Sequence, residues 1–309
     1  MNHSPPFVRP DVAALLAAVE AAGNPPVGTL DASATRAMYK EMRGASDTEV
    51  GEMAVMRDSS APGPAGDIAL RRFDALAERE AGPIIVYFHG GGFVIGDLDT
   101  HASLCAEVAR VTGLPVISVA YRLAPEARFP AAPDDCLAVT RWIAAQGDAT
   151  ALILMGDSAG ANLAIVTAMT LRDDPAAVPV VAQALLYPVV EPIRGEGSEA
   201  DFATGHLLTS DAMRWFDAQY GPQVGDVRAY PIGADQAGMP ATLVMTASLD
   251  PLRDQGRRYA AACILAGVET RYLEAAGTIH GFATMRLMMP SGQEDLASFI
   301  AETLRMIER

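Results

Sequence analysis

The sequence predicts an α/β fold, in which a mostly parallel, doubly wound sheet of eight strands carries a helical cap. Short apolar runs recur along the 309 residues, and helical patterns separate most of them. From Ile84 onward these runs are continuous rather than alternating, which is typical of strands buried on both faces of a parallel sheet. Strands that alternate with helices imply right-handed crossovers, and a composition that is 50% apolar provides enough side chains for a large core.

Eight runs are expected to form the sheet. The first two precede any helical crossover, so we expect them to pair as an antiparallel edge. In chain order the predicted strands are Glu52–Met56, Ile68–Phe73, Ile84–Phe88, Val116–Ala120, Leu152–Met155, Val181–Tyr187, Thr242–Ala247 and Thr270–Glu274. The predicted helices between them are Ser103–Thr112, Pro133–Ala145, Asn162–Arg172 and Gln255–Ala266.

Two segments, residues 1–46 and 191–238, break this alternation. The second lies between two core strands, and an insertion of this length is commonly a lid. We therefore expect both segments to form one cap over the carboxyl ends of the strands, where open α/β sheets bind ligands. The predicted cap helices are Val12–Ala22, Ala32–Arg43 and Ser210–Tyr220, and the two parts of the core are 47–190 and 239–309. Asp31 is the expected N-cap of the second helix, and Gly44 is its expected end.

Composition limits the partners of the chain. The net charge of −15 is spread along the sequence, and Lys40 is the only lysine, so we expect a surface that repels nucleic acid and anionic membranes. The three widely spaced cysteines, Cys105, Cys136 and Cys263, are expected to be buried thiols rather than metal ligands or disulfides. No apolar run reaches the length that a membrane span needs.

The apolar stretch VAALLAAVEAAG near the N-terminus could pass for the core of a signal peptide. Arg9 is the only basic residue before it, Asp11 directly precedes it, and Glu20 lies within it. An amphipathic surface helix explains this pattern better, so we expect a cytoplasmic protein. The sequence leaves the oligomeric state open, and a homodimer is one alternative.

The segment GDSAG, residues 156–160, follows a predicted buried strand and precedes a helical pattern. A G-x-S-x-G turn in this context is typical of a nucleophile elbow, in which the serine side chain projects above the sheet edge. Gly156 and Gly160 lack a Cβ, so neighbouring backbone can pack closely against the turn. Ser158 could instead be a helix-capping residue, and a catalytic role therefore depends on finding a base for it.

His280 is the best candidate for that base. It follows the last predicted strand, and a loop at this point returns to the sheet edge that carries Ser158. The other histidines lie near the N-terminus, in a glycine-rich loop, at a helix start and in the cap, and they are His3, His89, His101 and His206.

Asp250 is the candidate carboxylate that would orient this base. It follows a predicted strand directly, although it could also be a mere helix N-cap, and Asp254 inside the next helix is a rival. The chain order Ser158, Asp250, His280 matches that of the α/β hydrolases.

The segment HGGGF, residues 89–93, follows the predicted strand Ile84–Phe88. Its consecutive glycines leave backbone N–H groups unshielded, and these donors could converge on an oxyanion together with the N–H of Ala159. A dinucleotide-binding G-x-G-x-x-G does not fit, because Ile95 occupies the last position. His89 is expected to fix the loop through hydrogen bonds rather than to act as a second base.

With these motifs assembled, the chain resembles the bacterial hormone-sensitive-lipase-like esterases, a family of α/β hydrolases. The resemblance covers about residues 80–285 and extends more weakly to the N-terminal helices and to residues 205–220. It rests on HGGGF at 89–93, YRLAPE at 121–126, FPAA at 129–132, GDSAG at 156–160, DPLRD at 250–254 and HGF at 280–282. Within YRLAPE, we expect Arg122 and Glu126 to form a structural charge pair, and we expect Asp157 to support the elbow.

The resemblance implies hydrolysis of short-acyl carboxylic esters through an acyl-enzyme, without a metal or cofactor. It implies Ser158 as nucleophile, His280 as base and Asp250 as the residue that orients the base. The implied oxyanion donors are the backbone N–H groups of Gly91, Gly92 and Ala159, with Gly90 as a further candidate. The apolar residues that could line the pocket are Phe93, Phe202, Leu207, Leu208, Trp215 and Phe282.

Two other functions remain alternatives. The chain could hydrolyse another acyl bond, such as an amide or an acetylated small molecule. It could also be a non-catalytic ligand receptor on the same fold, as some relatives are after losing a member of the triad. Ser158, Asp250 and His280 are all present here, which counts against the receptor.

Overall fold

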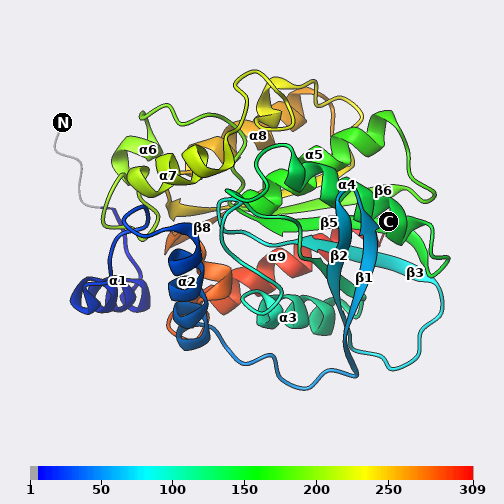
Figure 1. Ribbon diagram of the computed structural model, residues 1–309, viewed down its shortest axis with the longest axis horizontal. Coiled ribbons are helices and arrows are strands. Elements are labelled where there is room, and N and C mark those ends of the chain that lie inside the picture. The colour runs from blue at the N-terminus through cyan, green and yellow to red at the C-terminus, as the bar shows by residue number, and fades with distance from the viewer. Residues whose placement is uncertain (1–5, 309) are drawn as a thin grey trace.

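The sheet has eight strands and lies between two layers of helices (Figure 1), in a computed structural model that describes residues 6–308. The strands are β1 Val55–Gly63, β2 Gly66–Asp74, β3 Gly82–Phe88, β4 Val116–Val119, β5 Ala149–Asp157, β6 Val180–Leu186, β7 Ala241–Leu249 and β8 Thr270–Ile279. Their spatial order is β1-β2-β4-β3-β5-β6-β7-β8. β2 is antiparallel to β1 and β4, and the other neighbours are parallel. The predicted fold class and antiparallel edge are therefore confirmed.

The helices fall into three groups in Figure 1. They are α1 Pro10–Ala22, α2 Ala32–Ser46, α3 Ala102–Thr112, α4 Ala131–Ala144, α5 Ala159–Asp173, α6 Ser198–Asp201, α7 Ser210–Tyr220, α8 Arg253–Leu265 and α9 Ser291–Ile307, with short 3₁₀ turns η1 Pro231–Gly233 and η2 Phe282–Thr284. α4, α5 and α8 cover one face of the sheet, and α3 and α9 cover the other. α1, α2, α6 and α7 gather at the left of the view, toward the ends at which the parallel strands finish.

β3 illustrates how the sequence builds this core. Ile84 and Val86 point into the apolar cluster under α4 and α5, whereas Ile85 and Tyr87 point into the cluster under α3 and α9. Successive side chains of a strand project from opposite faces, so a strand with helices on both sides has to be apolar at every position. The continuous run IIVYF meets that requirement, and all of its side chains are at most 1% exposed.

β1 differs most from its prediction, because it begins at Val55 rather than Glu52 and continues to Gly63. Seven residues beyond Met56 pair with β2, and most of them are exposed. An edge strand has one free side and faces solvent, so the polar run RDSSAPG carries no apolar pattern that could have extended the prediction.

The helices at the two ends of the chain also depart from the predictions. Asp31 is the N-cap of α2 as predicted, because its Oδ1 accepts the N–H of Ala34 at 2.8 Å, but the helix runs through Gly44 to Ser46. A glycine inside a helix costs only about 1 kcal/mol relative to alanine, so α2 continues through Gly44 instead of ending there. The amphipathic C-terminal helix α9 was not predicted.

Three smaller expectations have clear outcomes. The three cysteines are buried free thiols, as predicted. The predicted pair between Arg122 and Glu126 is wrong, because Arg122 binds the buried Asp135 (Nη2–Oδ1, 2.7 Å) and Glu126 binds Arg36 of α2 (Oε2–Nη2, 2.6 Å). These two ion pairs tie the YRLAPE segment to α4 and α2, instead of joining two residues of the segment to each other. Within residues 6–308, no helix has the length and apolar character to cross a membrane.

Candidate active site

Ser158 stands at the junction of β5 and α5 in a strained backbone conformation, with φ +53° and ψ −118°. Its N–H donates to the carbonyl of Leu186 on β6 at 2.9 Å, which fixes the turn to the sheet. A Cβ at Gly160 would lie 1.9 Å from the carbonyl oxygen of Phe88. Only glycine allows the end of β3 to approach the elbow so closely, and strain of this kind is typical of functional turns.

The structure brings Ser158, His280 and Asp250 together. His280 Nε2 lies 3.0 Å from Ser158 Oγ, and its Nδ1 lies 2.8 Å from Asp250 Oδ2. Asp250 is fully buried, and its other oxygen accepts the N–H of Leu252 at 2.8 Å. These distances allow the imidazole to accept the serine proton while the carboxylate holds its opposite N–H.

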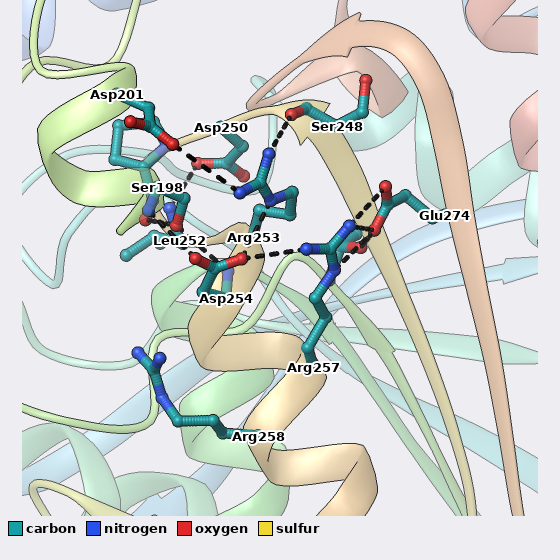
Figure 2. Close-up of polar contacts among 12 residues, drawn as sticks. Ser198, Asp201, Ser248, Asp250, Leu252, Arg253, Asp254, Arg257, Arg258 and Glu274 are labelled. Carbon is teal, nitrogen blue, oxygen red and sulfur yellow. Dashed lines mark hydrogen bonds and ion pairs between the residues drawn. The ribbon is translucent and has the colours of Figure 1, made fainter. Parts of the chain in front are cut away.

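Asp254, the rival carboxylate, lies in a different environment (Figure 2). Its oxygens accept the backbone N–H of Ser198 at 3.0 Å, Arg253 Nε at 2.9 Å and Arg257 Nη1 at 3.1 Å. Arg257 also binds Glu274 on β8. Asp254 therefore fastens α8 to the insertion that contains α6 and, through Arg257, to the last strand.

The glycine loop lies beside the elbow, but its three glycines are not equivalent. The N–H of Gly90 donates to Asp157 Oδ1 at 2.8 Å, so it is not free to bind an oxyanion, and Gly90 is removed from the predicted donors. Gly91, Gly92 and Ala159 line the same pocket as Ser158 and His280. A Cβ on Gly92 would lie 2.3 Å from the ring of Phe216, so α7 packs directly on this loop.

Buried polar groups hold the loop from behind. Burial alone would raise the pKa of Asp157, but His101, Tyr87 and the N–H of Gly90 bring this pKa down to about 2. Tyr87 donates to Asp157 at 2.7 Å, and His101 Nε2 lies 3.3 Å from it. His89 contacts the carbonyl of Gly90 through Nδ1 at 2.8 Å, and burial lowers the pKa of its ring to about 4. His89 is therefore neutral near pH 7 and fixes the loop, in keeping with the role expected for it.

His206, the remaining histidine that the structure describes, does not contact Ser158. His206 turns toward Phe202 and the carbonyl of Thr204, and His3 lies outside the described residues. The choice of His280 over the others therefore rests on direct geometry as well as on its place after the last strand.

Above Ser158 lies a pocket of about 600 Å³. Its wall is formed by α1, α2, the glycine loop, the elbow, the insertion with α7, and the loop after His280. Of the predicted pocket residues, Phe93, Leu207 and Leu208 lie on this wall. The wall thus joins segments from both ends of the chain over the carboxyl ends of the strands.

The other three predicted pocket residues lie elsewhere. Phe202 packs against His206 under Arg253, Phe282 lies in the core against Tyr187, and Trp215 packs on Gly28. On α7, the residues that face the pocket are Ala212, Met213, Phe216 and Asp217. They share one helical face at spacings of three and four residues, and Trp215 projects from the adjacent face.

Sequence reasoning expected residues 1–46 over the site but named none of the α2 residues on the pocket wall, among them Tyr39, Arg43 and Ser46. Arg43 and Ser46 are buried although both are polar. Their spacing of three residues was a signal that they share a face, but nothing in the sequence indicated which way that face turns.

A family model described as the alpha/beta hydrolase fold matches residues 85–284. The chain belongs to the α/β-hydrolase family. It is 32% identical to the ethyl acetate hydrolase of Pseudomonas putida over 309 aligned positions, which cover 95% of this chain and 97% of that protein. It is 35% identical to the esterase LipI of Mycobacterium tuberculosis over 77% of this chain and 78% of that one.

Solved structures of this α/β-hydrolase family agree with the fold. An ester hydrolase from the metagenome of Lake Arreo, complexed with a bipyridine phosphonate derivative, is 35% identical and superposes with a TM-score of 0.93 over 98% of this chain and 100% of that one. An esterase of Pyrobaculum calidifontis is 32% identical, with a TM-score of 0.88 over 97% and 99% of the two chains. The predicted relationship to the hormone-sensitive-lipase-like esterases is confirmed at the level of the family.

Proposed function

We propose that this chain is a carboxylesterase that hydrolyses short-acyl carboxylic esters through an acyl-enzyme formed on Ser158. The contact that carries the proposal is His280, whose Nε2 lies 3.0 Å from Ser158 Oγ while its Nδ1 lies 2.8 Å from Asp250. The site opens into a pocket large enough for a small ester. The relatives named above are ester hydrolases, which supports the same reaction class.

The proposed reaction has two halves. Ser158 Oγ attacks the ester carbonyl while His280 takes its proton, and the N–H groups of Gly91, Gly92 and Ala159 stabilise the oxyanion that forms. His280 then gives the proton to the departing alkoxide, leaving an acyl-serine. A water molecule, activated by the same imidazole, attacks that acyl group, and the acid leaves as Ser158 regains its proton. Asp250 holds the imidazole in the required tautomer throughout.

The cap is proposed to set the acyl limit. Residues 1–46 and 191–238 would cover the site, exclude water and thereby strengthen its electrostatics. An added methylene in an apolar pocket discriminates by about 1–3 kcal/mol, so enlarging the pocket should shift chain-length preference gradually. The test is to replace Leu207, Leu208 and Phe216 by alanine one at a time and measure kcat/KM from acetyl to decanoyl nitrophenyl esters, with Trp215→Ala as a control outside the wall. An unchanged profile in the three wall variants would remove the cap from this role.

One set of assays tests the two alternative functions, which are hydrolysis of another acyl bond and ligand binding by a receptor without catalysis. The wild type should release a burst of nitrophenol from nitrophenyl acetate, and Ser158→Ala should not. A matched amide should be hydrolysed far more slowly than its ester, because an amine is the poorer leaving group. No burst from a folded wild type would favour the receptor, and equal rates on ester and amide would favour the broader acyl hydrolase.

Catalysis without a metal or cofactor is a further part of the proposal. Dialysis against a chelator should leave kcat unchanged. Loss of activity that a divalent ion restores would contradict it. Cytoplasmic residence and a homodimer stay predictions.

A further inference from the structure

Arg43 is a buried cation on the wall of the active-site pocket. Its side chain comes from α2, is 7% exposed, and lies with its guanidinium 4.7 Å from the centre of the Tyr39 ring. Nη1 donates to the carbonyl of Thr284, in the loop that follows His280, at 2.9 Å. The aromatic face and the carbonyl hold the guanidinium in place without neutralising its charge.

Within the described part of the chain, Arg43 contacts Tyr39 and Thr284 but has no carboxylate partner, which a buried charge normally has. Its Nε is buried and has no hydrogen-bond partner in the described part of the chain. Among residues 6–308, no carboxylate forms an ion pair with it, and an arginine stays protonated at any physiological pH. One turn later, the buried hydroxyl of Ser46 on the same pocket wall also has no partner among the described residues.

Buried polar groups are almost always hydrogen-bonded, and buried charges are almost always paired. Two atoms without a partner among the described residues, Arg43 Nε and Ser46 Oγ, belong to side chains on the pocket wall at adjacent turns of α2, and they point to an acceptor that a ligand supplies. A carboxylate fits both, because it carries the opposite charge and has lone pairs for a guanidinium and a hydroxyl at once.

The position of Arg43 links this end of the pocket to the reacting atoms. A Cβ on Gly281, the residue after His280, would lie 3.3 Å from Arg43 Nη2. The guanidinium is thus beside the residue that follows the candidate base. An acyl chain that runs from Ser158 past His280 would therefore lead toward it.

None of the carboxylates that line the described pocket pairs with Arg43, and Asp157 among them is held by Tyr87 and by the N–H of Gly90. Arg43 is the only arginine or lysine among the described residues that line the pocket. Glu191 is neutralised by Arg194, at 2.6 Å, and by Arg258. Asp217 lies on α7 and accepts from Tyr230 Oη at 3.4 Å, and Glu41 is on an exposed part of α2.

We propose that Arg43 and Ser46 form a carboxylate subsite, and that the enzyme hydrolyses half-esters of short dicarboxylic acids. The ester carbonyl would lie at Ser158 and the free carboxylate at Arg43, and water would convert the half-ester into the diacid and an alcohol. This inference rests on the proposed esterase function and adds a substrate class to it.

The test compares monomethyl and dimethyl esters of succinic, glutaric and adipic acid, with initial rates of acid release followed in a pH-stat at pH 8. Each pair shares one acyl chain and differs only in the free carboxylate. Arg43→Gln should lower the half-ester to diester ratio of kcat/KM about ten- to a hundredfold, the range expected for hydrogen bonds to a charged group. Ser46→Ala should lower the ratio by about three- to tenfold.

Lys40→Gln is the matched control. It removes one positive charge from the same helix, but Lys40 is exposed and pairs with Asp97 and Asp99 outside the pocket. Its ratio should equal that of the wild type. Arg43→Lys keeps the charge and loses the planar fork, so its ratio should lie between those of the wild type and Arg43→Gln.

An unchanged ratio in Arg43→Gln, or an equal loss on both esters, would overturn the subsite and leave Arg43 as a support for the loop at Thr284. If Arg43→Gln does not fold, Ser46→Ala and Arg43→Lys decide by the same ratio. A wild type that hydrolyses the diesters but no half-ester also overturns the subsite. Failure of the proposed esterase function is distinguishable, because the wild type would then hydrolyse neither ester.

Discussion

Replacing Asp250 by asparagine should disable the site while preserving its shape. Asp250 Oδ1 accepts the N–H of Leu252 at 2.8 Å, and Oδ2 faces His280 Nδ1 at 2.8 Å. An asparagine that keeps the bond from Leu252 turns its NH₂ toward His280. The imidazole would then carry its proton on Nε2, where it cannot accept the proton of Ser158.

The direction of the loss follows from the two amide orientations. The flipped asparagine would restore the correct tautomer, but its NH₂ would meet the N–H of Leu252 in a fully buried place. Leaving two buried donors face to face costs about 1–3 kcal/mol, so the inactive orientation should dominate. This preference accounts for a loss of up to about 150-fold. The carboxylate also stabilises the imidazolium that forms in the transition state, so with its charge removed we expect kcat to fall about 10⁴-fold in all, equivalent to about 5.5 kcal/mol, with a much smaller change in KM.

The assay is steady-state hydrolysis of nitrophenyl butyrate by the wild type, Asp250→Asn and the matched control Asp254→Asn. Asp254 binds Ser198, Arg253 and Arg257, not His280 (Figure 2). Its replacement should cost about 1 kcal/mol in the free energy of unfolding and change kcat only a few-fold. If Asp254→Asn, with both variants folded, lowered kcat more than Asp250→Asn did, the assignment of the orienting acid would be refuted.

Three further predictions concern the loop and the charges around the site. Gly92→Ala would place a Cβ 2.3 Å from the Phe216 ring, so the oxyanion loop must shift and kcat should fall about 10²–10³-fold; Gly44→Ala, with nothing within 4 Å, should leave kcat unchanged. Burial raises the pKa of Asp217 to about 6, so the folded state binds this proton more tightly than the unfolded state. Asp217→Asn should therefore raise the free energy of unfolding by about 1–2 kcal/mol at pH 8 and little at pH 4, measured in urea, and equal effects at both pH values would contradict this. Burial lowers the pKa of His89 from 6.5 to about 4, so the unfolded state binds more protons in that window and stability should fall as the pH falls. Between pH 7 and pH 5 the free energy of unfolding of the wild type should fall by about 2 kcal/mol more than that of His89→Gln. Equal decreases in the two proteins would refute a neutral buried His89.

The parts of the fold that the sequence predicted are those in which burial alone dictates the residues. The run IIVYF of β3 must be apolar at every position because both of its faces are covered. β1 continues through RDSSAPG because its backbone pairs with β2 while its side chains face solvent, and pairing of that kind leaves no mark in the sequence. The structural role of a glycine is also not evident from the sequence. Gly44 lies inside α2, whereas Gly160 is required because the carbonyl of Phe88 approaches it closely.

The candidate site divides in the same way. Ser158, Asp250 and His280 could be predicted because each follows a strand, and parallel strands bring their ends to one edge. The pocket wall depends on how α2 and α7 are rotated, which sequence periodicity alone does not determine. Hence Phe216 lines the pocket where Trp215 was expected, and Arg43 was overlooked. Gly90 failed as an oxyanion donor because a buried partner, Asp157, takes its N–H.

The central claim is that Ser158 carries the acyl group during turnover. The most direct measurement is to treat the protein with diethyl nitrophenyl phosphate, which transfers its phosphoryl group to an activated serine, and to locate the adduct by peptide mass spectrometry. The account predicts one phosphoryl group per chain, located on Ser158, with esterase activity lost in proportion to labelling and no labelling of Ser158→Ala. A stoichiometric adduct on any other residue, or full esterase activity in Ser158→Ala, would contradict it.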